Sequence, residues 1–320
     1  MNILVAGING FVGHHVARTL SSEGHSIIGL GSQPEAAADL SSIVDRYYGF
    51  DMTNAEEVST LNLEGVDAII NLAGFAKVGE SIGQGELYNR VNVGVHTVLY
   101  EECLRQNVSP RVIAISTGAV YDPRQKLPIT EASQLIDDDK TNEYTISKKL
   151  MERAVLGYSD LGLDCIIVRP FNHSGPGQMP GFLIPDLGEQ ITDAAKNNTP
   201  LMVGNLKTKR DYTDVRDVAR AYTLLATIER SKLHHRIYNI CSGTSVIGED
   251  ILQMMMEAFA IEGLEVNVDP KKIRPNDVME IYGSRARMTQ DTGWEPEIPV
   301  KQMIADYAAW KQGVDPENNR

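Results

Sequence analysis

The sequence predicts an α/β fold in which a doubly wound, parallel sheet is joined to a smaller C-terminal α/β lobe. Short apolar segments alternate with amphipathic helical segments from residue 2 to residue 168, a rhythm typical of parallel strands connected by helices. A glycine-rich turn, residues 7–13, directly follows the first apolar segment. After Val168 come residues 169–178 (RPFNHSGPGQ), whose many turn-forming residues indicate where the chain leaves the main sheet.

The composition excludes several classes of protein. A hydrophobic fraction of 42% over 320 residues suffices for a large core and fits neither a disordered nor a membrane protein. The net charge of −13 argues against nucleic acid or anionic lipid as the main partner. No apolar run reaches the ~18 residues of a membrane helix, and Met1 leads straight into a strand, so we expect a cytoplasmic protein. The three cysteines lack metal-ligand spacing, which predicts buried, reduced thiols and no metal site.

The first strand, residues 2–6, predicts a dinucleotide site because a triplet of glycines comes directly after it. Gly7 permits a tight turn, Gly10 lets the backbone approach a phosphate, and Gly13 lets the next helix pack closely on the strand. That helix runs to about Gly24, and its N-terminus is where a pyrophosphate is expected.

The second strand, residues 25–30, is expected to end in the group that contacts the adenosine ribose. An acidic residue there favours NAD, and an arginine accepts the 2′-phosphate of NADP. The chain has Gly31, Ser32 and Gln33 at this place, so the choice between NAD and NADP stays open.

Two further strands are expected at residues 47–51 and 66–74, followed by a long helix at 86–106. Asp51 is placed either to meet the adenine or to cap the next turn. The fourth strand ends in small residues, as backbone contact with a cofactor requires. Asn92 lies inside the long helix, where an asparagine is more often solvated or locally bonded than functional.

The fifth strand, residues 111–121, brings Ser116 and Thr117 to the carboxyl edge of the sheet, where such folds bind ligands. The next helix opens with Tyr144 and Lys148, which lie four apart and share a face. An ammonium lowers the pKa of a nearby phenol, which is ordinarily about 10. Hydroxyl, phenol and cation together suit proton transfer to or from a carbonyl or alcohol oxygen.

A second Tyr-xxx-Lys pair, Tyr307 and Lys311, tests how specific this spacing is. No hydroxyl-bearing strand precedes it, so we interpret it as part of an ordinary amphipathic helix.

The remaining chain predicts a two-part organisation. A sixth strand at 164–168 precedes the turn-rich segment, and a helix at 182–196 follows it. A helix at 215–229 and a strand at 235–240 are expected to return to the main sheet. The first domain then comprises residues 1–170 plus 215–243, and the second comprises 171–214 plus 244–320. Cations of the second domain suited to a diphosphate, or to plain surface charge, are Lys207, Lys209, Arg210 and Arg274.

Together these motifs resemble the extended short-chain dehydrogenase/reductases, which include nucleotide-sugar epimerases, dehydratases and reductases. The resemblance rests on the glycines of 7–13, residues 71–74 (NLAG), Ser116-Thr117 and the Tyr144/Lys148 pair, in that order along the chain. Residues 169–178, 210–218 (RDYTDVRDV) and 292–299 (TGWEPEIP) are most similar to the branch of GDP-mannose 4,6-dehydratase and GDP-4-keto-6-deoxy-mannose reductase, and closer to the reductase.

The resemblance implies a Rossmann domain that binds NAD or NADP and a second lobe that binds a nucleotide-diphospho-sugar. It makes Tyr144 the acid/base, Thr117 the hydroxyl on the reacting oxygen, and Lys148 the group that binds the nicotinamide ribose and lowers the pKa of Tyr144. The implied cofactor contacts are Gly7, Asn9, Gly10, Phe11, Val12, Gly13, Ser32, Asp51, Met52, Leu72, Ala73, Gly74, Asn92, Ser116, Tyr144 and Lys148. The implied substrate contacts are Lys77, Thr117, Asn172, Arg210 and Arg274. A homodimer through the helices near 86–106 and 143–160 is also implied.

One departure from the family pattern bears on the reaction. In the family's dehydratases an acidic residue closely follows the catalytic threonine, but here Gly118, Ala119 and Val120 follow it. None of these side chains exchanges a proton, so a dehydratase is disfavoured. The sequence therefore favours a reductase of a nucleotide-linked 4-keto-6-deoxyhexose, with a nucleotide-sugar 4-epimerase as the alternative and a non-catalytic NAD(P) sensor as a third hypothesis.

Overall fold

The computed structural model describes residues 1–273 and 277–314. Within them, seven parallel strands form the main sheet in the order β11-β6-β5-β4-β1-β2-β3. Their bounds are β1 Asn2–Ala6, β2 Ser26–Gly31, β3 Arg46–Gly49, β4 Ala68–Asn71, β5 Arg111–Ile115, β6 Cys165–Pro170 and β11 Ile237–Ile240.

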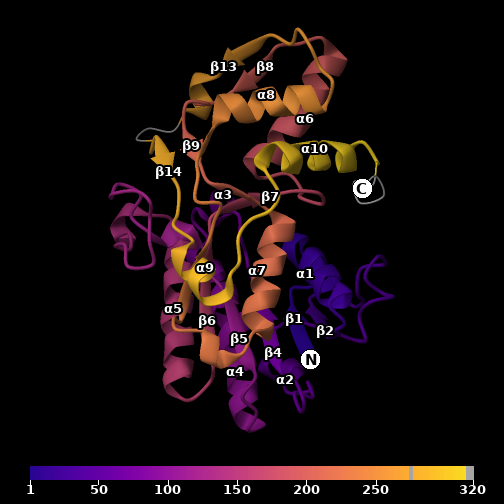
Figure 1. Ribbon diagram of the computed structural model, residues 1–320, viewed down its shortest axis with the longest axis vertical. Coiled ribbons are helices and arrows are strands. Elements are labelled where there is room, and N and C mark those ends of the chain that lie inside the picture. The colour runs from indigo at the N-terminus through magenta and orange to yellow at the C-terminus, as the bar shows by residue number, and fades with distance from the viewer. Residues whose placement is uncertain (274–276, 315–320) are drawn as a thin grey trace.

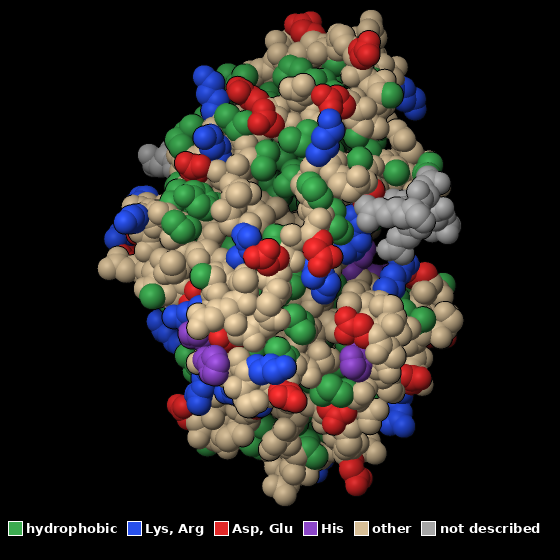
Figure 2. Space-filling view, in the orientation of Figure 1, with side chains coloured by type: hydrophobic (Ala, Val, Ile, Leu, Met, Phe, Trp, Pro, Cys, Tyr) green, Lys and Arg blue, Asp and Glu red, His purple; other side chains and the backbone are tan. Residues whose placement is uncertain are grey.

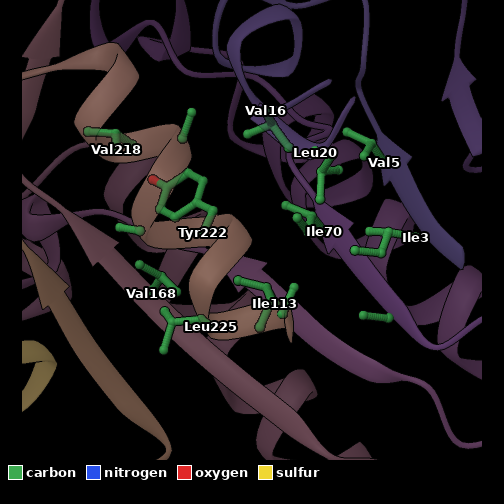
Figure 3. Close-up of a cluster of buried hydrophobic side chains, with 14 of the residues drawn as sticks. Ile3, Val5, Val16, Leu20, Ile70, Ile113, Val168, Val218, Tyr222 and Leu225 are labelled. Atoms are coloured by element: carbon green, nitrogen blue, oxygen red, sulfur yellow. The ribbon is translucent and has the colours of Figure 1, made fainter. Parts of the chain in front are cut away.

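Helices cover both faces of this sheet (Figure 1). They are α1 Phe11–Ser22, α7 Val215–Thr227 and α9 Ala286–Thr292 on one side, and α2 Ala55–Val58, α4 Gly85–Arg105 and α5 Glu143–Asp160 on the other. The β-branched side chains that alternate along each strand pack against these helices, so both faces are apolar. Figure 3 shows one such layer, where Val16 and Leu20 of α1 and Val218 and Leu225 of α7 meet strand side chains such as Ile70.

The strand order reverses between β1 and β4, because the chain builds β2 and β3 on one side of β1 and the later strands on the other. This topology opens a crevice at the carboxyl ends of these strands, which is where doubly wound folds bind their ligands. The predicted doubly wound parallel fold is therefore confirmed, and the strand at 235–240 does return to the main sheet as β11.

A second, smaller group of elements lies above this edge of the sheet in Figure 1. It contains α6 Leu183–Asn197, α8 Gly248–Ala258 and α10 Val300–Lys311, which share an apolar core with Leu201 and Tyr212. The short strands here are β7 Asn172–Ser174, β8 Leu201–Val203, β9 Lys209–Arg210, β10 Tyr212–Asp214, β12 Val246–Ile247, β13 Val266–Val268 and β14 Glu280–Ile281, and α3 Val78–Ser81 lies below them.

Some predicted elements are wrong in detail. Residues 66–74 are not one strand, because β4 ends at Asn71 and residues 72–74 leave the sheet towards the crevice. The segment at 169–178 is not only a loop, since β6 continues to Pro170 and Asn172–Ser174 pairs in parallel with β10. Tyr307 is buried in the second core and Lys311 pairs with Glu189 on the surface, so the second Tyr-xxx-Lys pair does belong to an amphipathic helix.

Most charged side chains lie on the surface and the three cysteines lie in the interior. Acidic and basic side chains are interspersed on the face shown in Figure 2. Cys103, Cys165 and Cys241 are all buried and unpaired with one another. In the ranges that the structure covers, no helix is long and apolar enough to cross a membrane, and no cluster of three potential metal ligands occurs.

Candidate active site

A cavity of about 2380 Å³ lies between the carboxyl edge of the main sheet and the second group of elements. A typical pocket for one small ligand measures about 300–1000 Å³, so this cavity has room for two. It is lined by most of the predicted site residues: Gly7, Asn9, Gly10, Phe11, Val12, Gly13, Leu72, Gly74, Lys77, Ser116, Thr117, Tyr144, Lys148, Asn172 and Arg210.

The glycine turn between β1 and α1 forms one wall. Gly7 has φ of +77°, a conformation that side chains rarely adopt, and a Cβ there would lie 2.9 Å from the backbone nitrogen of Ala73. A Cβ on Gly13 would lie 2.4 Å from the carbonyl oxygens of Gly7 and Ile8, so only glycine lets α1 approach the strand. Gly10 caps α1 without a side-chain hydrogen bond, which leaves the first amides of the helix for an anion. This cradle fits a dinucleotide pyrophosphate.

The side chain of Asn9 connects the glycine turn to the loop that follows β2. Its Oδ1 accepts a hydrogen bond from the amide of Ala37 at 2.9 Å, and its Nδ2 donates to the carbonyl of Glu35 at 2.9 Å. The loop after β2 is thereby held over the turn, with Ser32 exposed just beyond the strand. Ser32 has neither the carboxylate that favours NAD nor the guanidinium that accepts the 2′-phosphate of NADP.

Besides Ser32, four predicted cofactor residues lie outside the cavity wall. Asp51 accepts hydrogen bonds from the amide and hydroxyl of Thr53 at 2.9 and 2.8 Å, as a residue that caps its own turn does. Met52 is buried in the core on the α4 side of the sheet. Ala73 is half-buried, and its amide donates to Asn71. Asn92 is the fourth.

The expectation that Asn92 is solvated or locally bonded is wrong. It is fully buried, its Oδ1 accepts from the amide of Phe75 at 2.7 Å, and its Nδ2 donates to the Ser147 hydroxyl at 2.8 Å. These partners are far away in sequence, so Asn92 ties α4 to the segment after β4 and to α5. The sequence pattern of one helix does not reveal such partners, because they come from other elements.

The three predicted catalytic residues converge on the cavity. Thr117 follows the end of β5, where its Oγ1 accepts from the amide of Ala119 at 3.2 Å and caps a short 3-10 turn. Tyr144 and Lys148 lie in the first turns of α5, whose N-cap is Asn142. The Lys148 ammonium donates to the carbonyl of Ile115 at 2.9 Å, two residues before Thr117.

The electrostatics of these groups follow from burial. Burial raises the pKa of Tyr144 above its ordinary value, although the neighbouring Thr117 hydroxyl opposes this shift. Burial lowers the pKa of Lys148 to about 8, and the charge of Glu152 opposes that shift. The described neighbour that lowers the pKa of Tyr144 is thus Thr117, while the Lys148 ammonium is engaged with a carbonyl. Tyr144 is therefore protonated at neutral pH, as a proton donor must be.

On the opposite side of the cavity, the predicted substrate contacts are spread over three elements. Asn172 is exposed in β7, and Lys77 pairs with Glu80 at 2.9 Å. Arg210 donates to the carbonyl of Val278 at 2.8 Å and lies 3.6 Å from Asp277. Of the other cations, Lys207 and Lys209 are exposed, and Arg274 lies outside the described residues.

Sequence reasoning missed a buried ion pair that lies next to Ser116. Glu152 of α5 and Arg169 of β6 are each 4% exposed, and Arg169 Nη2 lies 2.6 Å from Glu152 Oε2. The signal was present in the sequence as an arginine that ends the apolar strand 165–168 and a glutamate four residues after Lys148.

Comparison with known proteins agrees with this geometry. The model of the NAD dependent epimerase/dehydratase family matches residues 3–241. GDP-6-deoxy-D-mannose reductase from Pseudomonas aeruginosa is 28% identical over 319 residues, covering 98% of this chain and 99% of that protein. A UDP-glucose 4-epimerase from Yersinia enterocolitica is 30% identical over 341 residues, covering 98% of each. The solved structure of RMD from Pseudomonas aeruginosa complexed with NADPH has a TM-score of 0.82 at 28% identity, covering 98% of this chain and 99% of that one.

The family match spans β1 to β11, which is the main sheet with the cavity-forming turn, the Thr117 strand end and the α5 pair. The resemblance drawn from the sequence motifs is confirmed at the level of the family. This chain belongs to the NAD dependent epimerase/dehydratase family of enzymes.

Proposed function

We propose that this protein reduces a nucleotide-linked 4-keto-6-deoxyhexose with NADH or NADPH. Tyr144 donates its proton to the C4 oxygen, Thr117 holds that oxygen by a hydrogen bond, and Lys148 contacts the nicotinamide ribose. When bound, the reduced nicotinamide supplies the hydride. The observation that carries the proposal is the position of Thr117, Tyr144 and Lys148 on the wall of the cavity that also contains the glycine cradle.

The residues after Thr117 support reduction over dehydration. Ala119 is exposed and Gly118 is half-buried, and neither exchanges a proton. A Cβ on Gly118 would lie 3.1 Å from the ring of Phe171, so the space beside the threonine is already filled by an apolar ring. A dehydratase needs a further acid and base at this place, whereas a ketone reductase does not.

The proposed ligands have support from relatives. The similar reductase acts on a GDP-linked 6-deoxy sugar by its name, and its solved relative holds NADPH. We propose NAD or NADP in the cradle and a nucleotide-diphospho-sugar on the side of Lys77, Asn172 and Arg210. We also propose the domain division at residues 170/171, 214/215 and 243/244, although α9 of the second part packs on the main sheet.

The test is direct. The purified protein is mixed with GDP-4-keto-6-deoxy-mannose or its deoxythymidine analogue, and oxidation of NADPH and NADH is followed by absorbance. Oxidation that depends on the ketosugar, with a 6-deoxyhexose product in the mass spectrum, is expected. If neither substrate causes oxidation of either nucleotide, the protein is not this reductase.

A nucleotide-sugar 4-epimerase is the second candidate, because the Yersinia relative with 30% identity is a UDP-glucose 4-epimerase. An epimerase recovers both C4 epimers from UDP-glucose or GDP-mannose without net oxidation of added nucleotide. A non-catalytic NAD(P) sensor is distinguished by Tyr144→Phe, which would leave the phenotype of a sensor intact.

We further propose a homodimer through α4 and α5. The apolar side chains Leu104, Leu156 and Leu161 are exposed on or next to these helices, which fits a face covered by a second copy. Light scattering is expected to give twice the mass of 35.2 kDa, and a monomer would refute this proposal.

A further inference from the structure

Glu152 and Arg169 form a buried ion pair beside the end of β5, the strand that Thr117 follows. The two guanidinium bonds, Nε to Oε1 at 2.8 Å and Nη2 to Oε2 at 2.6 Å, make the pair bidentate. Arg169 also lies over the ring of Tyr121, with 4.8 Å from Cζ to the ring centroid. A buried ion pair often adds no more stability than apolar residues of the same volume. Its presence here therefore calls for a role beyond stability.

The carboxylate is also bonded to the strand that carries Thr117. The Ser116 hydroxyl, 3% exposed, donates to Glu152 Oε1 at 2.5 Å. One helical turn earlier, the Lys148 ammonium donates to the carbonyl of Ile115 at 2.9 Å. Two residues of α5 thus hold consecutive residues of the β5 end, and the next residue is Thr117.

We propose that Glu152 is a positioning residue of the reaction. It fixes the strand end that carries Thr117 relative to the helix that carries Tyr144 and Lys148. Arg169 offsets the cost of burying the Glu152 carboxylate, because it donates two hydrogen bonds and supplies the opposite charge. Glu152 does not line the cavity, and it acts through its hydrogen bond with Ser116.

The charges around Lys148 agree with this role. Lys148 lies in α5 next to the end of β5, and the described titratable side chains that interact with its charge are His96 of α4 and Glu152 of α5. Tyr144 lies one turn before it in the same helix. Burial keeps the pKa of His96 well below its ordinary value, so this imidazole is neutral. Tyr144 is protonated, since burial raises its pKa. Glu152 is then the described anion that favours the charged form of Lys148.

Two variants separate the charge from the hydrogen bond. Glu152→Gln combined with Arg169→Met removes both charges and keeps an acceptor for Ser116. Ser116→Ala removes the hydrogen bond and keeps the ion pair. Asp291→Asn is the matched control, because Asp291 is a buried carboxylate of α9, which packs on the main sheet, and it accepts from Tyr238 of β11 at 2.6 Å.

The charge is tested by NMR titration of Lys148 in protein labelled at lysine Nζ, with Lys148→Arg identifying the signal. In the double variant the pKa of Lys148 is expected to fall by about one unit, because an opposite charge nearby stabilises the ammonium. In Ser116→Ala and Asp291→Asn it is expected to equal that of the wild type. A wild-type pKa in the double variant, or an equal fall in Asp291→Asn, would overturn the electrostatic role.

The hydrogen bond is tested by kinetics and binding in Ser116→Ala. The expected kcat is about tenfold lower, as for a small misplacement of reacting groups, with an unchanged Kd for NADPH measured by fluorescence. A wild-type kcat contradicts the positioning role. A raised Kd that accounts for the loss makes Ser116 a direct cofactor contact and contradicts it as well.

The kinetic test rests on the proposed reductase activity, whereas the titration and the Kd do not. A protein that oxidises no nucleotide yet shows the lowered Lys148 pKa in the double variant refutes the proposed function and retains this inference. If the double variant does not fold, Ser116→Ala decides the matter alone.

Discussion

Tyr144 is buried at the wall of the cavity, and burial raises its pKa, so the phenol holds its proton at neutral pH. Tyr144→Phe removes that proton and leaves the shape of the site unchanged. We expect kcat for ketone reduction to fall by about 10²–10⁴-fold, the usual contribution of a positioned acid, with an unchanged Kd for NADPH. Steady-state kinetics and fluorescence titration measure the two quantities.

Tyr307→Phe is the control for this variant. Tyr307 has the same spacing to a lysine, is buried in the second core, and has a hydroxyl without a hydrogen-bond partner among the described residues. Wild-type kcat in Tyr307→Phe is expected. Equal losses in both variants would show that the phenol of Tyr144 has no special part in the reaction.

The pH dependence of reduction should follow Lys148. Its pKa is lowered to about 8 by burial, while that of Tyr144 stays above its ordinary value. Reduction needs both groups protonated, so kcat is expected to be constant below pH 8 and to fall tenfold per unit above it. A profile of kcat against pH tests this, and a constant rate to pH 10 would show that the ammonium is dispensable.

Single residues also show where sequence reasoning succeeds and fails. The catalytic set lies on the cavity because its placement depends on the ends of elements, which hydrophobic periodicity predicts. The binding of Asn92 to Phe75 and Ser147 was not predictable, since it depends on how three elements meet. Ser116 has a hydroxyl that is committed to Glu152, a partner 36 residues away. The cofactor contacts named from the resemblance stay predictions.

Among the elements, α4 and α5 form one layer over the sheet, and Asn92 is a polar link between them. Asn92→Ala leaves the amide of Phe75 and the Ser147 hydroxyl without this partner in a dry interior. A lost hydrogen bond to a buried group costs about 1–3 kcal/mol, so the free energy of unfolding should fall by that amount. Urea unfolding measures the change.

Asn89→Ala is the matched control on the same helix. Within the described part of the chain the Asn89 side-chain oxygen accepts no hydrogen bond, so its truncation should cost much less than that of Asn92. An equal cost for both would mean that the cross-links of Asn92 contribute nothing beyond ordinary packing.

The short strands mark the limit of prediction at the level of elements. The central main strands β1, β4, β5 and β6 are largely buried and consist mostly of apolar residues, whereas β3 at the edge is partly exposed. By contrast, β7 consists of Asn172, His173 and Ser174, and only its pairing with β10 makes it a strand. Such a strand forms because the turn-rich segment pairs with residues 212–214, and a local sequence pattern does not predict this pairing.

At the level of the whole molecule, the ion-pair network of Arg216 joins the two groups of elements. Arg216 lies in α7 over the main sheet, and its guanidinium lies 2.6 Å from Asp214, the last residue of β10 and N-cap of α7, and 2.6 Å from Asp306 of α10. His15 of α1 adds a further link, with Nε2 at 2.9 Å from the carbonyl of Pro176. The walls of the cavity are therefore held together by the Arg216 network, which lies outside the lining, and by the His15–Pro176 contact within it. A ligand that bridges the walls should stabilise the entire fold.

Ligand-linked stability tests this view of the molecule. A ligand that binds only the folded state adds about 2.7 kcal/mol at a hundredfold excess over Kd, so NADPH should raise the free energy of unfolding of the wild type by that amount. Gly10→Ala is expected to abolish most of this gain, because a methyl group there faces the pyrophosphate. It should cost the unliganded protein less than Gly13→Ala, since its Cβ would lie 3.1 Å from the carbonyl oxygen of Gly7.

Gly13→Ala supplies the contrast, because its methyl group would lie 2.4 Å from two backbone oxygens of the strand-to-helix turn. This variant should lose more stability than Gly10→Ala without NADPH, whereas the main loss in Gly10→Ala should be the response to NADPH. Urea unfolding at several NADPH concentrations distinguishes the two patterns. A wild-type response to NADPH in Gly10→Ala would mean that the dinucleotide does not lie on the N-terminus of α1, and the proposed cofactor site would have to be abandoned.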